Sequence, residues 1–309
     1  MQRVILAVRT GRSSGAKSVL AKDDRIRVGR VDRADLVVHD NKMSGVHFEV
    51  SWDGARCQMR DLESASGTEL GGRRVTEGEV PHGGWIRAGG TDFTLHYEGL
   101  TPPPVDFDTY FDDAEDDEVA PIRAEWLRLN REPRRLAAAA LAARREKALR
   151  ELTAAGPRFA VLDSARSERI QVLLTEAVEQ SRSLYEGIEG DSLAHVAPYL
   201  VELAPGSRLF AQLVREGWEQ RWGIFIDAPC SFKEMRRHLR RLLLVSDADS
   251  RSNFYFRFYD PVILAAFVPV ATVKQRFELF GEVRAYLAEN ETGDVVRFDS
   301  SEPEARGAS

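Results

Sequence analysis

The sequence of 309 residues lacks the usual marks of a secreted or membrane protein. It has only two cysteines, Cys57 and Cys230, which lie far apart in the chain. This excludes the disulfide framework of small secreted proteins and is typical of a reducing cytoplasm. No stretch approaches the roughly 18 apolar residues of a membrane-spanning helix. The apolar run near residue 5 is too short for a signal peptide. We therefore expect a cytoplasmic protein with no membrane partner.

Motifs for catalysis and for metal binding are also missing. The chain has no G-x-S-x-G, H-E-x-x-H, C-x-x-C or Walker A motif, and its six histidines show no metal-ligand spacing. Asp163, Asp227 and Asp260 each follow an apolar strand, a position where α/β enzymes often hold catalytic carboxylates. A hydrolase that uses Asp163 or Asp227, with His195 nearby in the same domain, is the minor alternative. The prediction is a protein that is not an enzyme and needs no metal or cofactor.

An excess of positive charge is absent as well. The net charge is −6 and the isoelectric point is near 5.7, so no overall basic field attracts nucleic acid. Basic residues gather in two segments, 123–150 and 236–241. On an acidic chain these segments do not predict nucleic-acid binding. The arginines of 236–241 form either a solvated face or a surface for an acidic partner.

What the first 99 residues do contain is a series of short β-type runs. Examples are "RVILAV", "RIRVG", "VHFEVSW" and "GWIRAG", separated by turns rich in Gly and Asp. Strands at this spacing without helical periodicity predict an all-β sandwich over residues 1–99. Asp53-Gly54 predicts a hairpin, because such turns require a positive φ angle.

The next two segments differ sharply in charge. Residues 100–121 open with three prolines and hold eight Asp or Glu between Asp106 and Glu118, with no Lys or Arg among them. Such a run repels itself and buries little, so it predicts a flexible linker. A docking motif built on its aromatic residues is the alternative. Residues 122–156 are rich in Ala, Leu and Arg and predict a basic connecting helix.

Residues 157–298 alternate between strand-like and helix-like patterns. "RFAVLD", "WGIFIDA" and "NFYFRFYD" are typical of strands, whereas 170–178, 210–218 and 235–242 show the apolar spacing of amphipathic helices. The pattern predicts an α/β domain with a mixed sheet and covering helices. The polar tail, 299–309, is expected to be disordered.

The N-terminal domain resembles the forkhead-associated (FHA) family. The resemblance is carried by "VGR" at 28–30, "SGVH" at 44–47 and "DLESASGTEL" at 61–70, in this order. It implies a β-sandwich whose loops at one end bind a phosphothreonine peptide. Residues implied to bind the peptide are Arg30, Ser44, Ser64, Ser66 and Gly67. Gly29 and His47 are implied to be structural, with the histidine bracing a loop.

Three positions depart from the pattern of that family. Gly45 replaces a basic or amide side chain, Ala65 replaces a hydroxyl residue, and Ser66 replaces an asparagine. Each lost charge-assisted contact is worth about 1–3 kcal/mol of binding free energy. Two interpretations therefore stay open: a phosphothreonine-binding domain, and a sandwich that docks a protein without dependence on phosphate.

The second domain resembles the family DUF4123. The pieces that carry the resemblance are "FAVLDSA" (159–165), "SLYEG" (183–187), "VAPYLVEL" (196–203), "WGIFIDAP" (222–229) and "FRFYDPVIL" (256–264). Members of this family look like adaptor chaperones of the bacterial type VI secretion system. The resemblance implies that the chain binds a cognate effector and loads it onto the VgrG spike.

The stretch "YFRFYDP", 255–261, contains the residues of most interest in this domain. Strand alternation predicts that Arg257 lies between two tyrosines and that Asp260 is its partner at the strand end. Pro261 suits the first turn of a following helix. Either the pair only fixes this turn, or the edge belongs to a partner-binding surface. Candidate residues for such a surface are Tyr185, Tyr199, Trp222, Arg257, Tyr259 and Asp260.

The sequence thus predicts a cytoplasmic bacterial adaptor for a type VI effector, with an FHA-like domain for regulatory docking. The alternative is a phosphothreonine-reading scaffold in a kinase pathway.

Overall fold

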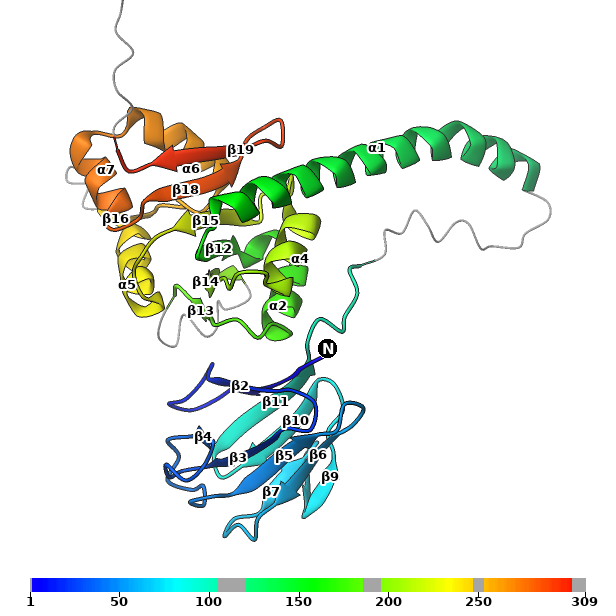
Figure 1. Cartoon of the computed structure of the whole chain (residues 1–309), viewed down its shortest axis with the longest axis vertical. Helices are drawn as coiled ribbons and strands as arrows, with labels where there is room; N and C mark the ends of the chain where they lie inside the picture. Colours follow the sequence, from blue (N-terminus) through cyan, green and yellow to red (C-terminus); the bar gives the residue numbers. More distant parts are fainter. Residues whose placement is uncertain (1, 105–119, 186–195, 247–252, 302–309) are drawn as a thin grey trace, which may run out of the picture. The chain divides into compact units, whose positions relative to one another are not determined.

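The computed structural model describes residues 2–104, 120–185, 196–246 and 253–301 (Figure 1). The chain divides into two compact units. The first holds Met1–Pro102 together with Val172–Arg182, and the second holds Pro103–Gln171 and Ser183–Ser309. Most of the acidic linker, His195 and the tail from residue 302 lie outside the described residues. None of the helices in the described ranges has an apolar stretch of the length needed to cross a membrane.

The first unit is a sandwich of two sheets, which confirms the predicted all-β domain. One sheet has the order β2-β1-β11-β10-β7-β8 and the other β4-β3-β5-β6-β9. The strands are β1 (Val4–Val8), β2 (Lys17–Leu20), β3 (Arg25–Gly29), β4 (Leu36–Val37), β5 (Phe48–Trp52), β6 (Cys57–Asp61), β7 (Thr68–Leu70), β8 (Arg73–Val75), β9 (Glu77–Glu79), β10 (Gly84–Ala88) and β11 (Thr91–Tyr97).

Alternating apolar residues from both sheets form the core of this sandwich. Phe48 of β5 and Phe93 of β11 meet edge to face, with ring centroids 5.2 Å apart, and both are fully buried. Cys57 also lies in this core as a free, buried thiol. The β5–β6 hairpin turns at Gly54, whose φ of 98° falls in the region that favours glycine. The Asp-Gly turn predicted here is therefore present.

The second unit is built on a six-stranded sheet of order β13-β14-β12-β15-β18-β19. Its strands are β12 (Phe159–Asp163), β13 (Ser181–Ser183), β14 (Pro198–Glu202), β15 (Gly223–Asp227), β18 (Ala285–Glu289) and β19 (Val295–Asp299); β16 (Leu244–Ser246) and β17 (Asn253–Tyr255) form a separate pair. The helices are α1 (Ala120–Ala155), α2 (Glu168–Thr175), α4 (Arg208–Gly217), α5 (Phe232–Leu242), α6 (Pro261–Phe267) and α7 (Val273–Phe280), with short 3₁₀ turns at η2 (Ser164–Arg166) and η4 (Val268–Val270). The edge strand β13 and the helix α2 lie partly within Val172–Arg182, the segment grouped with the first unit.

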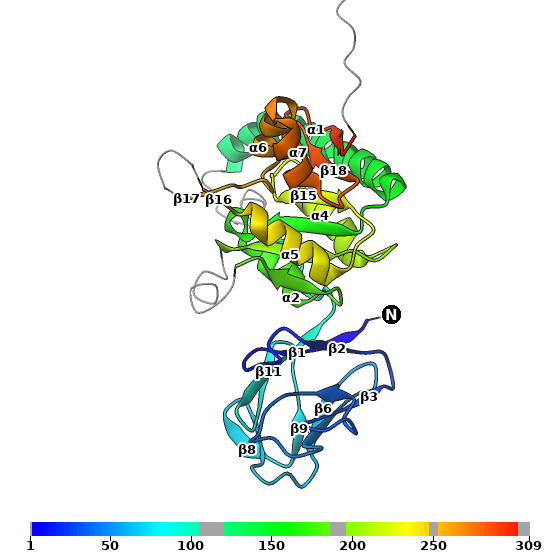
Figure 2. The same cartoon turned by 90° about the vertical axis from the view of Figure 1, so that its left-hand side faces the viewer.

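Helices cover both faces of this sheet (Figures 1 and 2). On one face, Phe159 and Val161 of β12 belong to a core shared with α5, α6 and α7. On the other face, Phe225 of β15 packs edge to face against Phe210 of α4, at 5.6 Å. All five residues of β12 are buried, as expected for a strand covered on two sides. The prediction of an α/β domain is confirmed. The pairings of β12 with β14 and β15, and of β18 with β15 and β19, are antiparallel.

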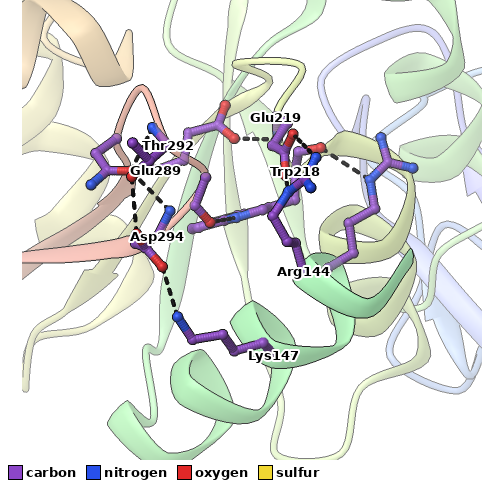
Figure 3. A network of polar contacts seen from close by, with 10 residues as sticks. Arg144, Lys147, Trp218, Glu219, Glu289, Thr292 and Asp294 are labelled. Atoms are coloured by element: carbon purple, nitrogen blue, oxygen red, sulfur yellow. Dashed lines mark hydrogen bonds and ion pairs between the residues drawn. The ribbon is translucent and has the colours of Figure 1, made fainter. Parts of the chain in front are cut away.

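The C-terminal half of α1 belongs to this unit and is fixed to it by ion pairs. Arg144 pairs with Glu219 at 2.5 Å, and Lys147 pairs with Asp294 at 2.7 Å (Figure 3). Leu152 of the same helix is fully buried. The basic residues at this end of α1 therefore serve packing within the second unit.

The turn at 219–221, which pairs with α1 through Glu219, is held by the buried carboxylate of Glu289. Glu289 accepts the backbone N–H groups of Glu219 and Arg221, the latter at 2.6 Å (Figure 3). Both residues of the turn have left-handed backbones, with φ of 67° and 55°. Trp218 donates its indole N–H to the Gly293 carbonyl at 2.7 Å. Burial raises the pKa of Glu289.

Two elements differ from the sequence patterns. The strand expected over 253–260 ends at Tyr255, because Phe258 and Tyr259 enter a turn that buries both rings. The helix expected to begin at Pro261 does not continue to Phe280, because the segment is broken into α6, η4 and α7. Pro269 explains the break, since it lacks the N–H that a continuous helix requires.

Candidate functional site

His47 connects two loops at one end of the first unit's sandwich. The ring is fully buried; its Nδ1 accepts the N–H of Ser44 at 3.0 Å, and its Nε2 lies 3.2 Å from the carbonyl oxygen of Gly67. An accepting Nδ1 places the proton on Nε2, which then donates to Gly67. The histidine thus braces the loops from inside and presents no surface to a ligand.

Arg30 and Ser44 lie on the exposed side of this brace. The Nε of Arg30 donates to the Met43 carbonyl at 3.1 Å, which orients the guanidinium. Within the described ranges no carboxylate lies within ion-pair distance of Arg30. Ser44 accepts the N–H of Ala65 at 2.9 Å, and among the described residues its own hydroxyl proton has no hydrogen-bond acceptor. A guanidinium and a hydroxyl donor held in this way suit an anionic group.

Ser64 has a different role from the one the resemblance implies. Its hydroxyl donates to Asp61 at 2.6 Å and accepts the N–H of Gly67 at 2.9 Å. Because its proton is donated to Asp61, Ser64 braces the loop and has no hydroxyl proton left to donate to a phosphate. Ser66 is exposed and donates to the Lys42 carbonyl at 3.3 Å.

Arg74 is a second guanidinium at this end that the sequence patterns did not identify. A Cβ atom added to Gly67, whose φ is 74°, would lie 2.3 Å from the Arg74 side chain. Arg74 therefore lies directly over Gly67. The sequence feature that could have predicted this position is the Gly71-Gly72 turn. It folds β8 back on β7 and pairs Arg74 with Glu69.

In the second unit, four charged side chains form a compact cluster at the end of β12. Asp163, 2% exposed, is contacted by the guanidinium of Arg257 and lies 3.5 Å from Arg166. Arg166 also pairs with Asp260 at 2.5 Å. The predicted pairing of Arg257 with Asp260 is therefore wrong: Arg257 pairs with Asp163, and Asp260 pairs with Arg166. The physical reason is that Asp260 caps α6, accepting the N–H of Val262 at 3.0 Å, and faces Arg166.

Tyrosines surround the exposed side of this cluster. The Arg257 guanidinium lies 5.8 Å from the ring centroid of Tyr259. Tyr259 is buried and hydrogen-bonds Tyr185 through its hydroxyl; burial, then the neighbouring Tyr185, raises the pKa of Tyr259. Tyr185 in turn contacts Tyr255 edge to face, at 6.1 Å. Burial of the Arg257 guanidinium opposes its charge, but Asp163 outweighs this and the pKa of Arg257 is raised.

The surface that results contains only some of the predicted residues. Tyr255 is 67% exposed, and the Arg257 side chain is 43% exposed. We name Tyr185, Tyr255 and Arg257 the tyrosine–arginine face. Trp222, predicted as a surface anchor, is buried, because its ring packs against Gly217.

Three further predicted anchors lie elsewhere or beneath the surface. Tyr259 and Asp260 are buried under the tyrosine–arginine face and support it from below. Tyr199 is half-buried on β14, opposite Leu162 in the sheet. Arg166, which the sequence patterns did not identify, follows Asp163 by three residues. This i, i+3 spacing directly after a buried strand could have predicted that Arg166 pairs with Asp163.

Comparisons with known proteins match the N-terminal and C-terminal parts of the chain to two different families. Residues 158–278 match the family described as "Domain of unknown function (DUF4123)". Residues 7–99 match the family described as "Inner membrane component of T3SS, cytoplasmic domain". The curated relative FHA domain-containing protein FhaB of Mycobacterium tuberculosis is 34% identical over 91 residues. That match covers 29% of this chain and 58% of the relative, so the chain spans little more than half of FhaB.

Solved structures of FHA domains also resemble the first unit. The FHA domain of CT664 from Chlamydia trachomatis is 25% identical, covers 30% of this chain and 96% of its own, and gives a TM-score of 0.29. The FhaA FHA domain, solved in complex with the intracellular domain of Rv3910, is 27% identical, covers 30% of this chain and 99% of its own, and gives a TM-score of 0.28.

The chain joins an FHA-like domain to a DUF4123 domain. Their sites are separate sets of residues: the loops around Arg30 in the first, and the tyrosine–arginine face in the second.

Two glycines of the FHA-like domain behave differently. A Cβ on Gly29 would lie 2.1 Å from the Gly45 carbonyl oxygen, so only glycine fits there. A Cβ on Gly45 would meet only the Val31 side chain, at 3.5 Å, which is ordinary contact. The backbone at Gly45 therefore accepts a side chain. The structure therefore does not require glycine at this position, where the FHA pattern has a basic or amide side chain.

Gly45→Arg is expected to strengthen phosphothreonine binding by about tenfold, since one charge-assisted hydrogen bond is regained. The measurement is fluorescence anisotropy with a degenerate phosphothreonine peptide library and its unphosphorylated form. Arg30→Ala in the Gly45→Arg background should remove the gain. Equal affinity of the variant for both forms of the library would contradict this account of the site.

Asp163→Asn is expected to lower the free energy of unfolding of the DUF4123 domain by about 2–3 kcal/mol, because Arg257 and Arg166 lose a buried counter-ion. Urea denaturation followed by circular dichroism measures the loss. Asp299→Asn is the matched control, since its pair with Arg297 is half exposed on both sides and is worth less than about 1 kcal/mol. Identical midpoints for the two variants would show that the cluster does not stabilise the domain.

Proposed function

We propose that the chain is an adaptor of a bacterial type VI secretion system. In this proposal its DUF4123 domain binds a cognate effector in the cytoplasm and presents it to the VgrG spike, and its FHA-like domain docks a regulatory protein. The observation that carries the proposal is the tyrosine–arginine face, which combines exposed aromatic and guanidinium groups on a rigid, buried base.

The composition of this face suits protein binding. Tyr and Arg are enriched among the residues that dominate protein–protein binding energy. Tyr255 is the exposed large aromatic residue nearest to Arg257 in sequence, and Tyr185 steadies its ring. Asp163 holds the Arg257 guanidinium on one side. A side chain fixed in this way loses little conformational entropy when a partner binds.

The carboxylates near this face favour binding over catalysis. Asp163 is engaged by two arginines, and Asp260 is engaged by Arg166 and by the start of α6. Asp227, the other candidate for a hydrolase, lies 3.7 Å from Arg284 and 3.6 Å from Arg297. A general base needs a carboxylate with access to a substrate proton. These pairings support the proposal that the chain is not an enzyme.

A second candidate function rests on the FHA-like domain. Arg30 has no carboxylate partner in the described part of the chain, and Ser44 retains a donor beside it. This supports a phosphothreonine-reading scaffold, as FHA domains are known to be. Gly45, Ala65 and the internal bonding of Ser64 weaken it. We therefore assign the FHA-like domain an accessory role.

The test is binding of the full chain to a candidate effector and to VgrG, measured by biolayer interferometry. Tyr255→Ala and Arg257→Ala are expected to weaken effector binding at least tenfold each, since each removes an exposed anchor. Phe277→Ala is the matched control, because this ring on α7 is 79% exposed. Arg30→Ala and phosphatase treatment should leave effector binding unchanged. Loss of binding on Arg30→Ala, with no effect of Tyr255→Ala, would favour the phosphothreonine scaffold.

A further inference from the structure

Helix α5 has two faces of opposite character. It begins after a capping box made by Ser231 and Glu234, and it buries Phe232, Met235 and Leu239 against the sheet. Its outer side carries five cations at spacings of three and four residues, which places them on one stripe. We name this stripe the basic stripe: Lys233, Arg236, Arg237, Arg240 and Arg241.

Two of these cations also hold the end of β13. Arg236 donates from Nε and Nη2 to the Ser183 carbonyl, at 3.0 and 2.8 Å. Arg240 donates from Nε to the Leu184 carbonyl at 3.0 Å. Their guanidinium groups are therefore fixed in place beside the exposed cations.

The other three cations, Lys233, Arg237 and Arg241, are exposed and follow one another at intervals of four residues. At a rise of about 1.5 Å per residue they span roughly 12 Å along the helix. In the described ranges no carboxylate lies within ion-pair distance of these three. The basic stripe lines a cavity of about 400 Å³, and every described residue in its lining is cationic.

This concentration of charge has a cost. Like charges four residues apart on a helix destabilise it by about 0.2–0.5 kcal/mol per pair. The stripe contains three such pairs, and Glu234, the acid within the same helix, is already bonded to Ser231. An anionic ligand would offset the repulsion.

We propose that the basic stripe binds a carboxylate-rich segment of a partner protein in an extended conformation. A span of roughly 12 Å matches about four extended residues at 3.3 Å each. Guanidinium forks such as those of Arg237 and Arg241 pair well with carboxylates. The stripe uses residues of α5 and none of the tyrosine–arginine face, although Arg240 bonds to Leu184, the residue before Tyr185.

Charge and composition favour a protein over a nucleic acid as the ligand. The stripe has no aromatic residue on which bases would stack, and the chain as a whole carries a net charge of −6. The chain's own acidic run between Asp106 and Glu118 is the competing occupant.

The experiment uses the full chain and a fluorescent peptide of eight alternating Asp and Glu residues, with the Asn/Gln peptide as its neutral counterpart. The triple variant Lys233→Gln, Arg237→Gln, Arg241→Gln is expected to weaken binding of the acidic peptide at least thirtyfold. The matched control is Arg12→Gln, Lys22→Gln, Lys274→Gln, which removes the same charge from exposed positions elsewhere and should change affinity less than threefold. Circular dichroism and the thermal midpoint confirm that both variants are folded.

Three outcomes would overturn the proposal. The first is equal binding of the acidic peptide to the triple variant and the wild type, or equal binding of the neutral peptide. The second is tighter binding of a single-stranded oligonucleotide than of the acidic peptide, lost in the triple variant. The third concerns a chain in which the eight acidic residues of 106–118 are changed to amides. A tenfold or greater gain in peptide affinity there would show that the chain's own acidic run occupies the stripe, whereas unchanged affinity supports an external partner.

Discussion

The carboxylate of Asp163 is the point to which distant parts of the DUF4123 domain are tied. It lies 2% exposed at the end of β12, an inner strand of the sheet, and receives Arg166 from the next turn and Arg257 from about ninety residues further along the chain. A charge buried in this way is costly unless it is paired. The pairing therefore fixes where the turn that follows β17 can lie. The same turn carries Asp260, which caps the start of α6 and pairs with Arg166. It also sets the exposed position of Arg257.

In the FHA-like domain, too, a buried polar group orders the surface, but here it is the imidazole ring of His47 and not a cluster of ion pairs. His47 has no solvent contact, and its two nitrogens join the loops that carry Ser44 and Gly67. The exposed Arg30 then lies on a loop that is held from inside, and Arg74 of β8 lies over Gly67 of the second braced loop. In both domains a buried polar group orders the surface, while the surface residues remain available for a partner.

The sequence predicted most of the architecture because its patterns are local. The alternation of the first 99 residues and the glycine turns predicted the sandwich, and the apolar spacing at 210–218 predicted α4. The sequence-based prediction was wrong where tertiary contacts outweighed the local pattern. Aromatic alternation over 253–260 suggested a continuous strand, but burial of Phe258 and Tyr259 produced a turn. The partner of Arg257 could not be deduced either, since Asp163 lies 94 residues away in sequence. Trp222 resembled an anchor by residue type alone, and only its packing on Gly217 shows that it is core.

Hydrogen–deuterium exchange of the full chain, with and without a bound effector, tests the central claim most directly. The claim is that the DUF4123 domain binds its partner through the tyrosine–arginine face. The account predicts that bound effector slows exchange in peptides covering 183–185 and 253–262, and leaves the loops at 28–47 and 64–75 unchanged. Protection confined to those FHA-like loops, with no change around Tyr255 and Arg257, would contradict it.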